Sequence, residues 1–171
     1  LDNLDINPVG SWAQSIPGMT IYVLARPTAF TSSVFPLVNT DTGLGTWWNG
    51  TNWTIGHSSG NYGTVTITND TSKFHIYGFV YNGSQSTNDT KIQFRYDKMG
   101  KTLSFTGTVG TDTGLPGAMF FGADDRNSGT FKQTYMDGYI GEVMIWTRAL
   151  SPSELASVEL YLNTKWNLGL T

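Results

Sequence analysis

The chain has 171 residues, a formal net charge of −3 and no cysteine, which excludes structural disulfides and thiolate metal sites. Its ten basic residues are scattered among thirteen acidic ones and form no basic run, so neither nucleic acid nor insertion into a membrane is expected. Only 13% of the residues are charged, against 20 glycines. This composition is typical of turn-rich β domains that work outside the cytosol.

Short apolar runs recur along the chain between clusters of Gly, Asn and Asp. They predict strands over residues 19–26, 34–38, 45–55, 63–68, 74–81, 91–96, 102–108, 118–122 and 139–146. Regular spacing of this kind indicates a two-sheet sandwich. Because no internal repeat or low-complexity linker is visible, we expect one domain over residues 1–171, as part of a longer protein.

Three tryptophans flank an Asn-Gly turn in residues 46–54. Trp47, Trp48 and Trp53 offer indole faces that can stack on sugar rings, and Asn49 offers an amide for sugar hydroxyls. These four residues are therefore candidates for glycan binding. A packing interpretation stays open beside this one, because a hairpin places Trp48 opposite Trp53, where the two rings can fill the core as a cross-strand pair.

Residues 74–81 are apolar or aromatic at both alternating sets of positions, which predicts a strand that is covered on both faces. We place its even-numbered apolar residues, Phe74, Ile76 and Val80, inside the sandwich. The odd-numbered set is then expected on the outer face, beneath a loop or a neighbouring subunit. That set comprises His75, Tyr77, Phe79 and Tyr81.

A hairpin turn is predicted at residues 97–101, between two runs with alternating apolar side chains. The large apolar groups of both runs then share one face. The opposite face is expected to present Gln93, Arg95, Ser104 and Thr106 to solvent.

A short helix is predicted near the C-terminus. Ser151 suits the N-cap, Pro152 suits the first helical position, and Glu154 completes a Ser-x-x-Glu capping box. Apolar residues then recur at helical spacing, at Leu155, Val158, Leu162 and Trp166. The opposite side of the helix, with Glu159, Asn163 and Lys165, is expected to face water. We expect this to be the only helix, packed on a β-structure.

Two segments carry a resemblance to a known superfamily. Residues 138–154 read Gly-x-Ile-Gly-Glu-Val-x-Ile-Trp-x-Arg-Ala-Leu-Ser-x-x-Glu and are followed by Tyr161-Leu162-x-x-Lys165-Trp166, while residues 19–28 read as an early strand. Together they resemble the laminin-G-like, or concanavalin A-like, jelly-roll superfamily. The resemblance implies an all-β fold, an antiparallel two-sheet β-sandwich with one short C-terminal helix. This fold carries lectins, glycanases, adhesion modules and virion surface domains alike.

The resemblance also suggests a calcium site, because sandwiches of this kind often bind Ca²⁺ at the sheet rim. The glycine-bounded segment 122–129 carries Asp124, Asp125 and Asn127, whose hard oxygen atoms suit Ca²⁺. Asp137 is a further candidate ligand, and the same loop can bind sugar hydroxyls through Asp124, Asp125 and Asn127. The alternative is a plain turn, in which Asp and Asn side chains bond to the local backbone.

Enzymatic activity is not expected. Glycanases on this fold place two carboxylates in one cleft, whereas the only glutamates here are Glu142, alone in a strand, Glu154, in the helix cap, and Glu159, on the helix. His57 and His75 are isolated from any orienting partner that the sequence shows, so we interpret both as structural.

The preferred hypothesis is a non-enzymatic, lectin-like module that binds a glycan or glycoprotein through rim loops, at an extracellular, cell or virion surface. The alternative is a structural or adhesive surface domain, such as a virion decoration or fibre module or an appendage subunit, that contacts other protein subunits. Sequons at Asn49, Asn52, Asn69, Asn82 and Asn88 would mark exposed loops in a host that glycosylates secreted proteins.

Overall fold

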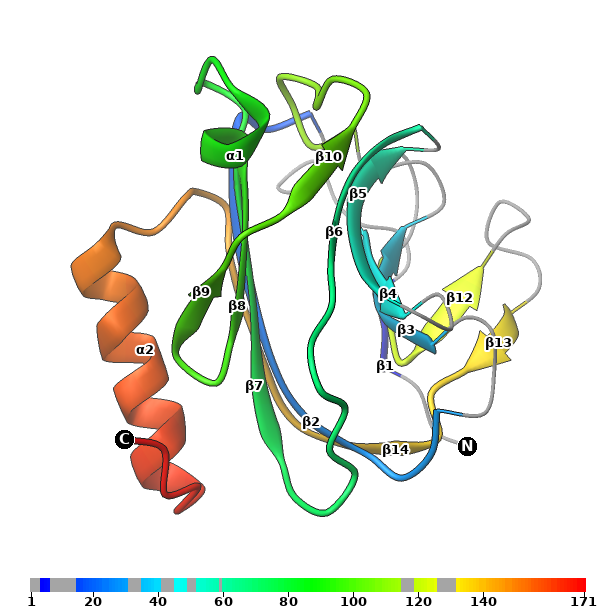
Figure 1. The fold of residues 1–171 in the computed structure, drawn as a ribbon, viewed down its shortest axis with the longest axis vertical. Helices are drawn as coiled ribbons and strands as arrows, with labels where there is room; N and C mark the ends of the chain where they lie inside the picture. The colour runs from blue at the N-terminus through cyan, green and yellow to red at the C-terminus, as the bar shows by residue number, and fades with distance from the viewer. Residues whose placement is uncertain are drawn as a thin grey trace.

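The computed structural model describes residues 4–6, 15–30, 35–40, 45–48, 52–58, 60–114, 119–125 and 132–171. Two antiparallel sheets face each other, and one long helix lies on the far side of one sheet (Figure 1). The predicted all-β, two-sheet sandwich is therefore confirmed. None of the described helices is both long and apolar enough to span a membrane.

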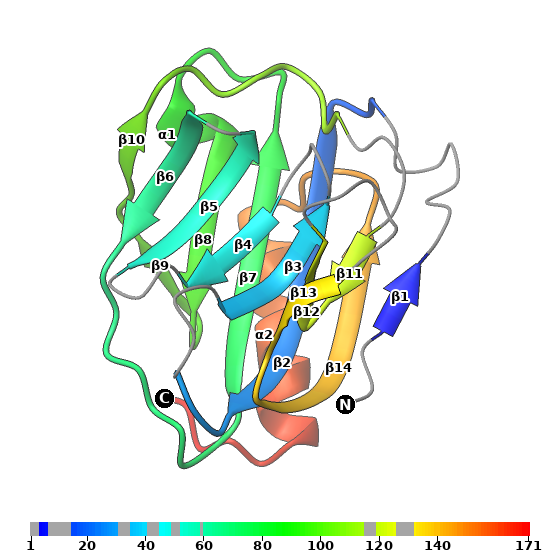
Figure 2. The same ribbon diagram turned by 90° about the vertical axis from the view of Figure 1, so that its right-hand side faces the viewer.

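The larger sheet, sheet A, has seven strands in the order β1-β11-β3-β4-β5-β6-β10. They are β1 (Leu4–Ile6), β11 (Met119–Phe121), β3 (Phe35–Thr40), β4 (Gly45–Trp48), β5 (Trp53–Ser58), β6 (Asn61–Val65) and β10 (Ser104–Thr106). A separate ribbon of two strands, β12 (Ala123–Asp125) and β13 (Lys132–Tyr135), lies beside β3 (Figure 2).

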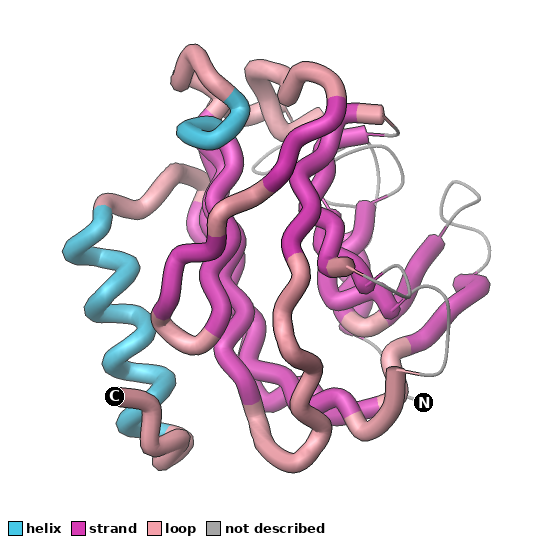
Figure 3. Tube along the Cα trace, viewed as in Figure 1, coloured by secondary structure: helices cyan, strands magenta, loops and turns pink. Residues whose placement is uncertain are grey.

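The smaller sheet, sheet B, has the order β14-β2-β7-β8-β9. Its strands are β14 (Gly138–Trp146), β2 (Gly18–Pro27), β7 (His75–Asn82), β8 (Ile92–Tyr96) and β9 (Met99–Lys101). The chain has a second helix besides the predicted one: α1 (Asn88–Lys91) is a single turn before β8, and α2 (Pro152–Lys165) is the C-terminal helix (Figure 3). The expectation of only one helix is therefore wrong, because α1 is an additional helix of a single turn.

Strand β7 is covered on both faces, as predicted, but the two faces are assigned the wrong way round. Tyr77, Phe79 and Tyr81 pack in the core between the sheets, whereas Ile76 and Val80 pack on the helix side. The cover on the outer face of sheet B is helix α2 of the same chain (Figure 1). Alternation shows that both faces are apolar but not which one meets the other sheet.

The prediction of which residues form the apolar side of α2 is confirmed. Leu155 and Leu162 are buried, and Val158 and Trp166 pack beside them against sheet B. Glu159, which we expected to face water, is only 2% exposed and accepts a hydrogen bond of 2.8 Å from the Tyr22 hydroxyl.

Arg95 also departs from its expected solvent position, because it forms an ion pair with Glu159. The Arg95 Nη2 atom lies 2.9 Å from the second carboxylate oxygen. Gly78 lies between Tyr22 and Arg95 in the register, and a Cβ atom there would lie 2.6 Å from the Tyr22 ring. The missing side chain therefore lets Tyr22 and Arg95 converge on one carboxylate of the helix.

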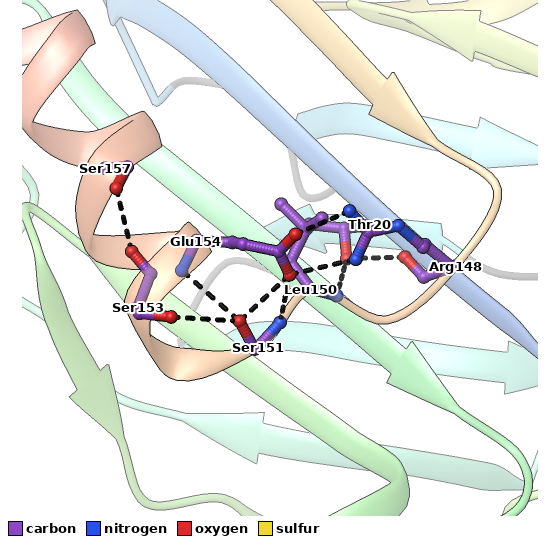
Figure 4. A network of polar contacts seen from close by, with 7 residues as sticks. All are labelled: Thr20, Arg148, Leu150, Ser151, Ser153, Glu154 and Ser157. Carbon is purple, nitrogen blue, oxygen red and sulfur yellow. Dashed lines mark hydrogen bonds and ion pairs between the residues drawn. The ribbon is translucent and has the colours of Figure 1, made fainter.

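The N-terminus of α2 has the predicted capping box (Figure 4). The Ser151 Oγ accepts from the Glu154 amide at 3.4 Å, and the Glu154 carboxylate accepts from the Ser151 amide at 2.8 Å. Arg148 donates twice to the same carboxylate, at 2.9 and 2.6 Å. The buried Thr20 hydroxyl donates to the Arg148 carbonyl and accepts from the Leu150 amide, so the cap is tied directly to strand β2.

Candidate functional site

The face of sheet A that points away from sheet B, here called the outer face of sheet A, is rich in hydroxyl groups. Trp53 and Ile55 of β5 face the core, so the alternate residue Thr54 belongs to the outer face. Thr54 pairs with Thr64 of β6, and Thr64 pairs with Ser104 of β10. Thr54 itself is only 3% exposed, so the accessible hydroxyls of this row are on β6 and β10. A second row of the same face pairs Tyr62 with Thr106.

On β6 and β10, the described side chains of this face carry hydrogen-bonding groups without charge. Ser104 and Thr106 are exposed, and Tyr62 and Thr64 are half-buried. The Thr64 hydroxyl donates to the Ser104 carbonyl at 3.3 Å. Hydroxyl groups donate and accept, and the ring of Tyr62 adds an amphipathic surface. The arrangement suits an uncharged ligand that is itself rich in hydroxyls.

Two of the three predicted tryptophans lie in the core. Trp48 pairs with Trp53 across strands β4 and β5, and the two side chains are 8% and 0% exposed. The Trp53 ring centroid is 5.1 Å from that of Tyr77, and its Nε1 donates to the Asn69 side chain at 3.3 Å. The packing interpretation is therefore correct for this pair. The expectation that Trp48 and Trp53 stack on a sugar is corrected, because burial leaves neither indole a free face.

The other predicted residues of this hairpin are only partly described. The backbone of Trp47 pairs with Thr54 and Pro36, which places it in the same row as Thr64 and Ser104. The side chain of Trp47, and all of Asn49, lie outside the described part of the chain. Their contact with a glycan stays a prediction.

The predicted calcium ligands are likewise partly outside the described residues. Asp124 and Asp125 lie in β12, where Asp124 pairs with Thr134, but their side chains and the whole of Asn127 are not described. Asp137 is three residues beyond Thr134, about 10 Å at the rise of an extended strand. Its carbonyl accepts from the Thr28 amide, so it lies at the base of the ribbon, away from the loop after Asp125.

Among the described residues, no cluster of three or more His, Asp or Glu side chains is arranged to hold a metal. This leaves Asp124, Asp125 and Asn127 as the predicted ligands whose side chains are yet to be placed. Asp137 is the weakest candidate of the four, because the ribbon separates its backbone from that of Asp125.

All three glutamates of the chain have structural partners around sheet B and α2. Although partial burial opposes ionisation, hydrogen bonds from Trp166 and Lys165 hold the pKa of Glu142 below its usual value. The Trp166 Nε1 lies 2.9 Å from Glu142, so this residue is not alone in its strand. Hydrogen bonds from Arg148 and Ser151 lower the pKa of Glu154 to about 2.

His75 is buried but not isolated, which corrects the expectation that it has no orienting partner. It is 2% exposed, and its Nδ1 lies 2.7 Å from an Asp97 oxygen and 2.9 Å from the Tyr96 hydroxyl. Its ring stacks on Tyr96 at a centroid distance of 5.0 Å. Burial in this stack closes the imidazole to a substrate. The side chain of His57 lies outside the described residues.

No family model and no curated protein matches the sequence of the chain. Solved structures do match. Domain 4 of AbnA, an extracellular GH43 arabinanase from Geobacillus stearothermophilus in complex with arabinotriose, has a TM-score of 0.65 at 15% identity, over 92% of this chain and 72% of that one. A pentraxin from Limulus polyphemus has a TM-score of 0.61 at 11% identity, over 91% and 75%.

Domains LG4-5 of the mouse laminin α1 chain have a TM-score of 0.58 at 15% identity, with 88% of this chain and 40% of that chain covered. These likenesses confirm the fold that the sequence resemblance implied. The chain has the concanavalin A-like jelly-roll fold.

Proposed function

We propose that this jelly-roll chain is a non-enzymatic recognition module that binds glycans outside the cytosol, through the outer face of sheet A and the loops at its rim. The supporting observation is the group of uncharged hydroxyls on β6 and β10, where Thr64 is half-buried and Ser104 and Thr106 are exposed. A similar solved domain was crystallised with arabinotriose, which supports a sugar as the ligand class for this fold.

The proposed contacts follow from the chemistry of the face. Hydroxyls of Thr64, Ser104 and Thr106 exchange hydrogen bonds with sugar hydroxyls, and Tyr62 packs on the apolar side of a sugar ring. We place Trp47 as the stacking residue at the end of this row, because its backbone pairs with Thr54. Asn49, after β4, extends the site along the rim.

The loop after β12 completes the proposed site with Asp124, Asp125 and Asn127, which bind sugar hydroxyls directly or hold a Ca²⁺ ion that orders the loop. Ca²⁺ that binds the native state alone raises the melting temperature. We expect added CaCl₂ to raise it by a few degrees, EDTA to reverse the rise, and Asp124→Ala to lack it. A melting temperature that changes with neither CaCl₂ nor EDTA would contradict the calcium part of the proposal.

The absence of hydrolysis is part of the proposal. Retaining and inverting glycosidases need two carboxyl groups that flank the scissile bond. Here the Glu142, Glu154 and Glu159 carboxylates bind Trp166, Ser151 and Tyr22 on the other side of the molecule. We expect the chain to retain oligosaccharides without shortening them, which mass spectrometry of the recovered ligand checks.

A glycan array tests the proposal directly. The wild type is expected to retain a subset of neutral glycans, and Trp47→Ala is expected to weaken retention roughly tenfold, the scale of one aromatic contact. Ser157→Ala, on the exposed side of α2, is the matched control and should behave as the wild type. A wild type that retains no glycan, with and without Ca²⁺, would refute the proposed function.

The alternative, a structural or adhesive subunit, has one supporting observation: Leu160 of α2 is a large apolar side chain that is 60% exposed. The apolar outer face of β7 no longer supports it, because α2 of the same chain covers that face. Light scattering separates the two functions. A monomer at high concentration is expected for the recognition module, whereas a concentration-dependent assembly lost in Leu160→Glu would favour the subunit.

A further inference from the structure

Arg26, in strand β2, has no carboxylate partner among the described residues. Of the three arginines that the structure describes, Arg95 pairs with Glu159 and Arg148 pairs with Glu154. Arg26 contacts two aromatic rings instead. Its guanidinium carbon lies 4.6 Å from the ring centroid of Tyr139 and 5.7 Å from that of Phe74.

The hydrogen-bonding capacity of Arg26 is incompletely used. The side chain is half-buried, and its Nε atom is buried without a hydrogen-bond partner. A buried donor without an acceptor is costly and rare. Cation–π contact with the two rings offsets part of that cost, but it does not supply the in-plane acceptor that a guanidinium fork fits.

The backbone around Arg26 brings Tyr139 into the same row. Tyr139 pairs directly with Arg26, and the register of β14 shifts between Ile140 and Glu142. Because of this one-residue bulge, Tyr139 and Glu142 both lie on the helix side of sheet B, opposite Arg26 and Leu24. Tyr139 is 55% exposed, which leaves its ring open to a ligand beside the guanidinium.

We propose that Arg26 and Tyr139 form a second binding site, on the helix side of sheet B, for a sugar that carries a carboxylate. Because Nε is buried, a carboxylate would accept two parallel hydrogen bonds from the terminal Nη1 and Nη2 atoms of Arg26, and the exposed Tyr139 packs against the sugar ring. We expect the ligand to carry a single negative charge and not to be a polyanion, because the chain has a net charge of −3 and no basic run.

This site is separate from the outer face of sheet A and rests on the proposed function only for the ligand class. A purely structural role for Arg26, as a cation held between two rings, predicts no response to acidic sugars. The two roles are distinguished by a signal from the Arg26 side chain itself.

The Nε–H resonance of Arg26 in a ¹⁵N-correlated spectrum reports on that side chain, and its loss in Arg26→Lys identifies it. We expect titration with glucuronic acid to move this signal in a saturable way, and glucose or acetate to move it much less. No movement, or equal movement with acetate or glucose, would overturn the proposal.

Matched variants measure the binding. Arg26→Lys keeps the charge but loses the fork, and Tyr139→Ala removes an exposed ring, so each is expected to weaken glucuronic acid binding about tenfold or more. Lys101→Gln is the control, because Lys101 also lies over a tyrosine ring. Wild-type affinity in both Arg26→Lys and Tyr139→Ala would overturn the proposal.

Retention of neutral glycans is measured on the same variants. If it survives in Arg26→Lys, the site on sheet A stands whatever becomes of the acidic-sugar site. If neutral glycans fail to bind while glucuronic acid still moves the Arg26 signal, the function proposed for sheet A falls and the Arg26 site remains.

Discussion

The two outer faces of this sandwich use opposite chemistry. Helix α2 covers the middle of the outer face of sheet B. Its apolar stripe is buried, and its Glu159 carboxylate is shared by Tyr22 and Arg95. Where β5, β6 and β10 pair, the outer face of sheet A presents hydroxyls such as those of Thr64 and Ser104 and no charged residue. Ion pairs fasten the helix to sheet B, whereas the uncharged polar groups of β6 and β10 are open to solvent.

The core behind sheet A gives the largest expected effect. Trp53→Ala removes a fully buried indole that packs on Tyr77, and a loss of about 4 kcal/mol in the free energy of unfolding is expected. Urea unfolding measures it. A loss below about 1 kcal/mol would mean that Trp53 is not a core residue.

The buried carboxylate of α2 comes next. Glu159→Ala leaves Tyr22 and Arg95 without their acceptor, and we expect a loss of about 3 kcal/mol, at the low end for a broken buried pair because Arg95 is partly exposed. Ser157→Ala on the same helix should change unfolding by less than about 0.5 kcal/mol. Equal stability of the two variants would contradict the role given to Glu159.

The helix cap gives a smaller effect. Ser151→Ala removes the acceptor for the Glu154 amide, and N-cap substitutions of this kind cost about 1 kcal/mol. Glycan retention should be unchanged, since the cap lies on the side opposite to sheet A. A Ser151→Ala variant that keeps its stability but no longer retains glycans would contradict the claim that the cap stabilises the fold and takes no part in binding.

The smallest effect is a dependence on pH. The pKa of Glu154 falls from 4.5 to about 2 on folding, so its stabilising contribution is complete above pH 4.5 and is lost as the pH falls towards 2. The melting temperature of the wild type should therefore fall further over this window than that of Glu154→Gln. Because Glu154 is solvent-exposed, the difference is expected to be small. Parallel curves of melting temperature against pH for the wild type and Glu154→Gln would contradict the lowered pKa of Glu154.

Local signals in the sequence predicted the helix side well. The capping box at Ser151 and the spacing of Leu155 and Leu162 depend on residues three and four apart, which a sequence displays directly. The sequence does not display the partners of Glu159 and Glu142 in this way, because the partners are distant along the chain. Arg95, for example, is 64 residues from Glu159. Gly78 was the available signal, since a glycine inside an apolar strand marks a close approach by a neighbour.

The candidate site was predicted only in part. The sequence singled out Ser104 and Thr106 as solvent-facing, which is confirmed, but placed them on the same sheet as Arg95. The chain crosses between sheets after β9, so β10 pairs with β6 instead. That crossing brings Ser104 to Thr64, and no periodicity in the sequence predicts which sheet a short strand joins.

Mapping a retained glycan by ¹⁵N chemical-shift perturbation tests the central claim most directly. The account predicts that amide signals of Tyr62, Thr64, Ser104 and Thr106 move together on titration with a neutral array-selected oligosaccharide, while those of α2 stay in place. Perturbations confined to α2 and the outer face of sheet B, or no perturbation by any oligosaccharide, would contradict it.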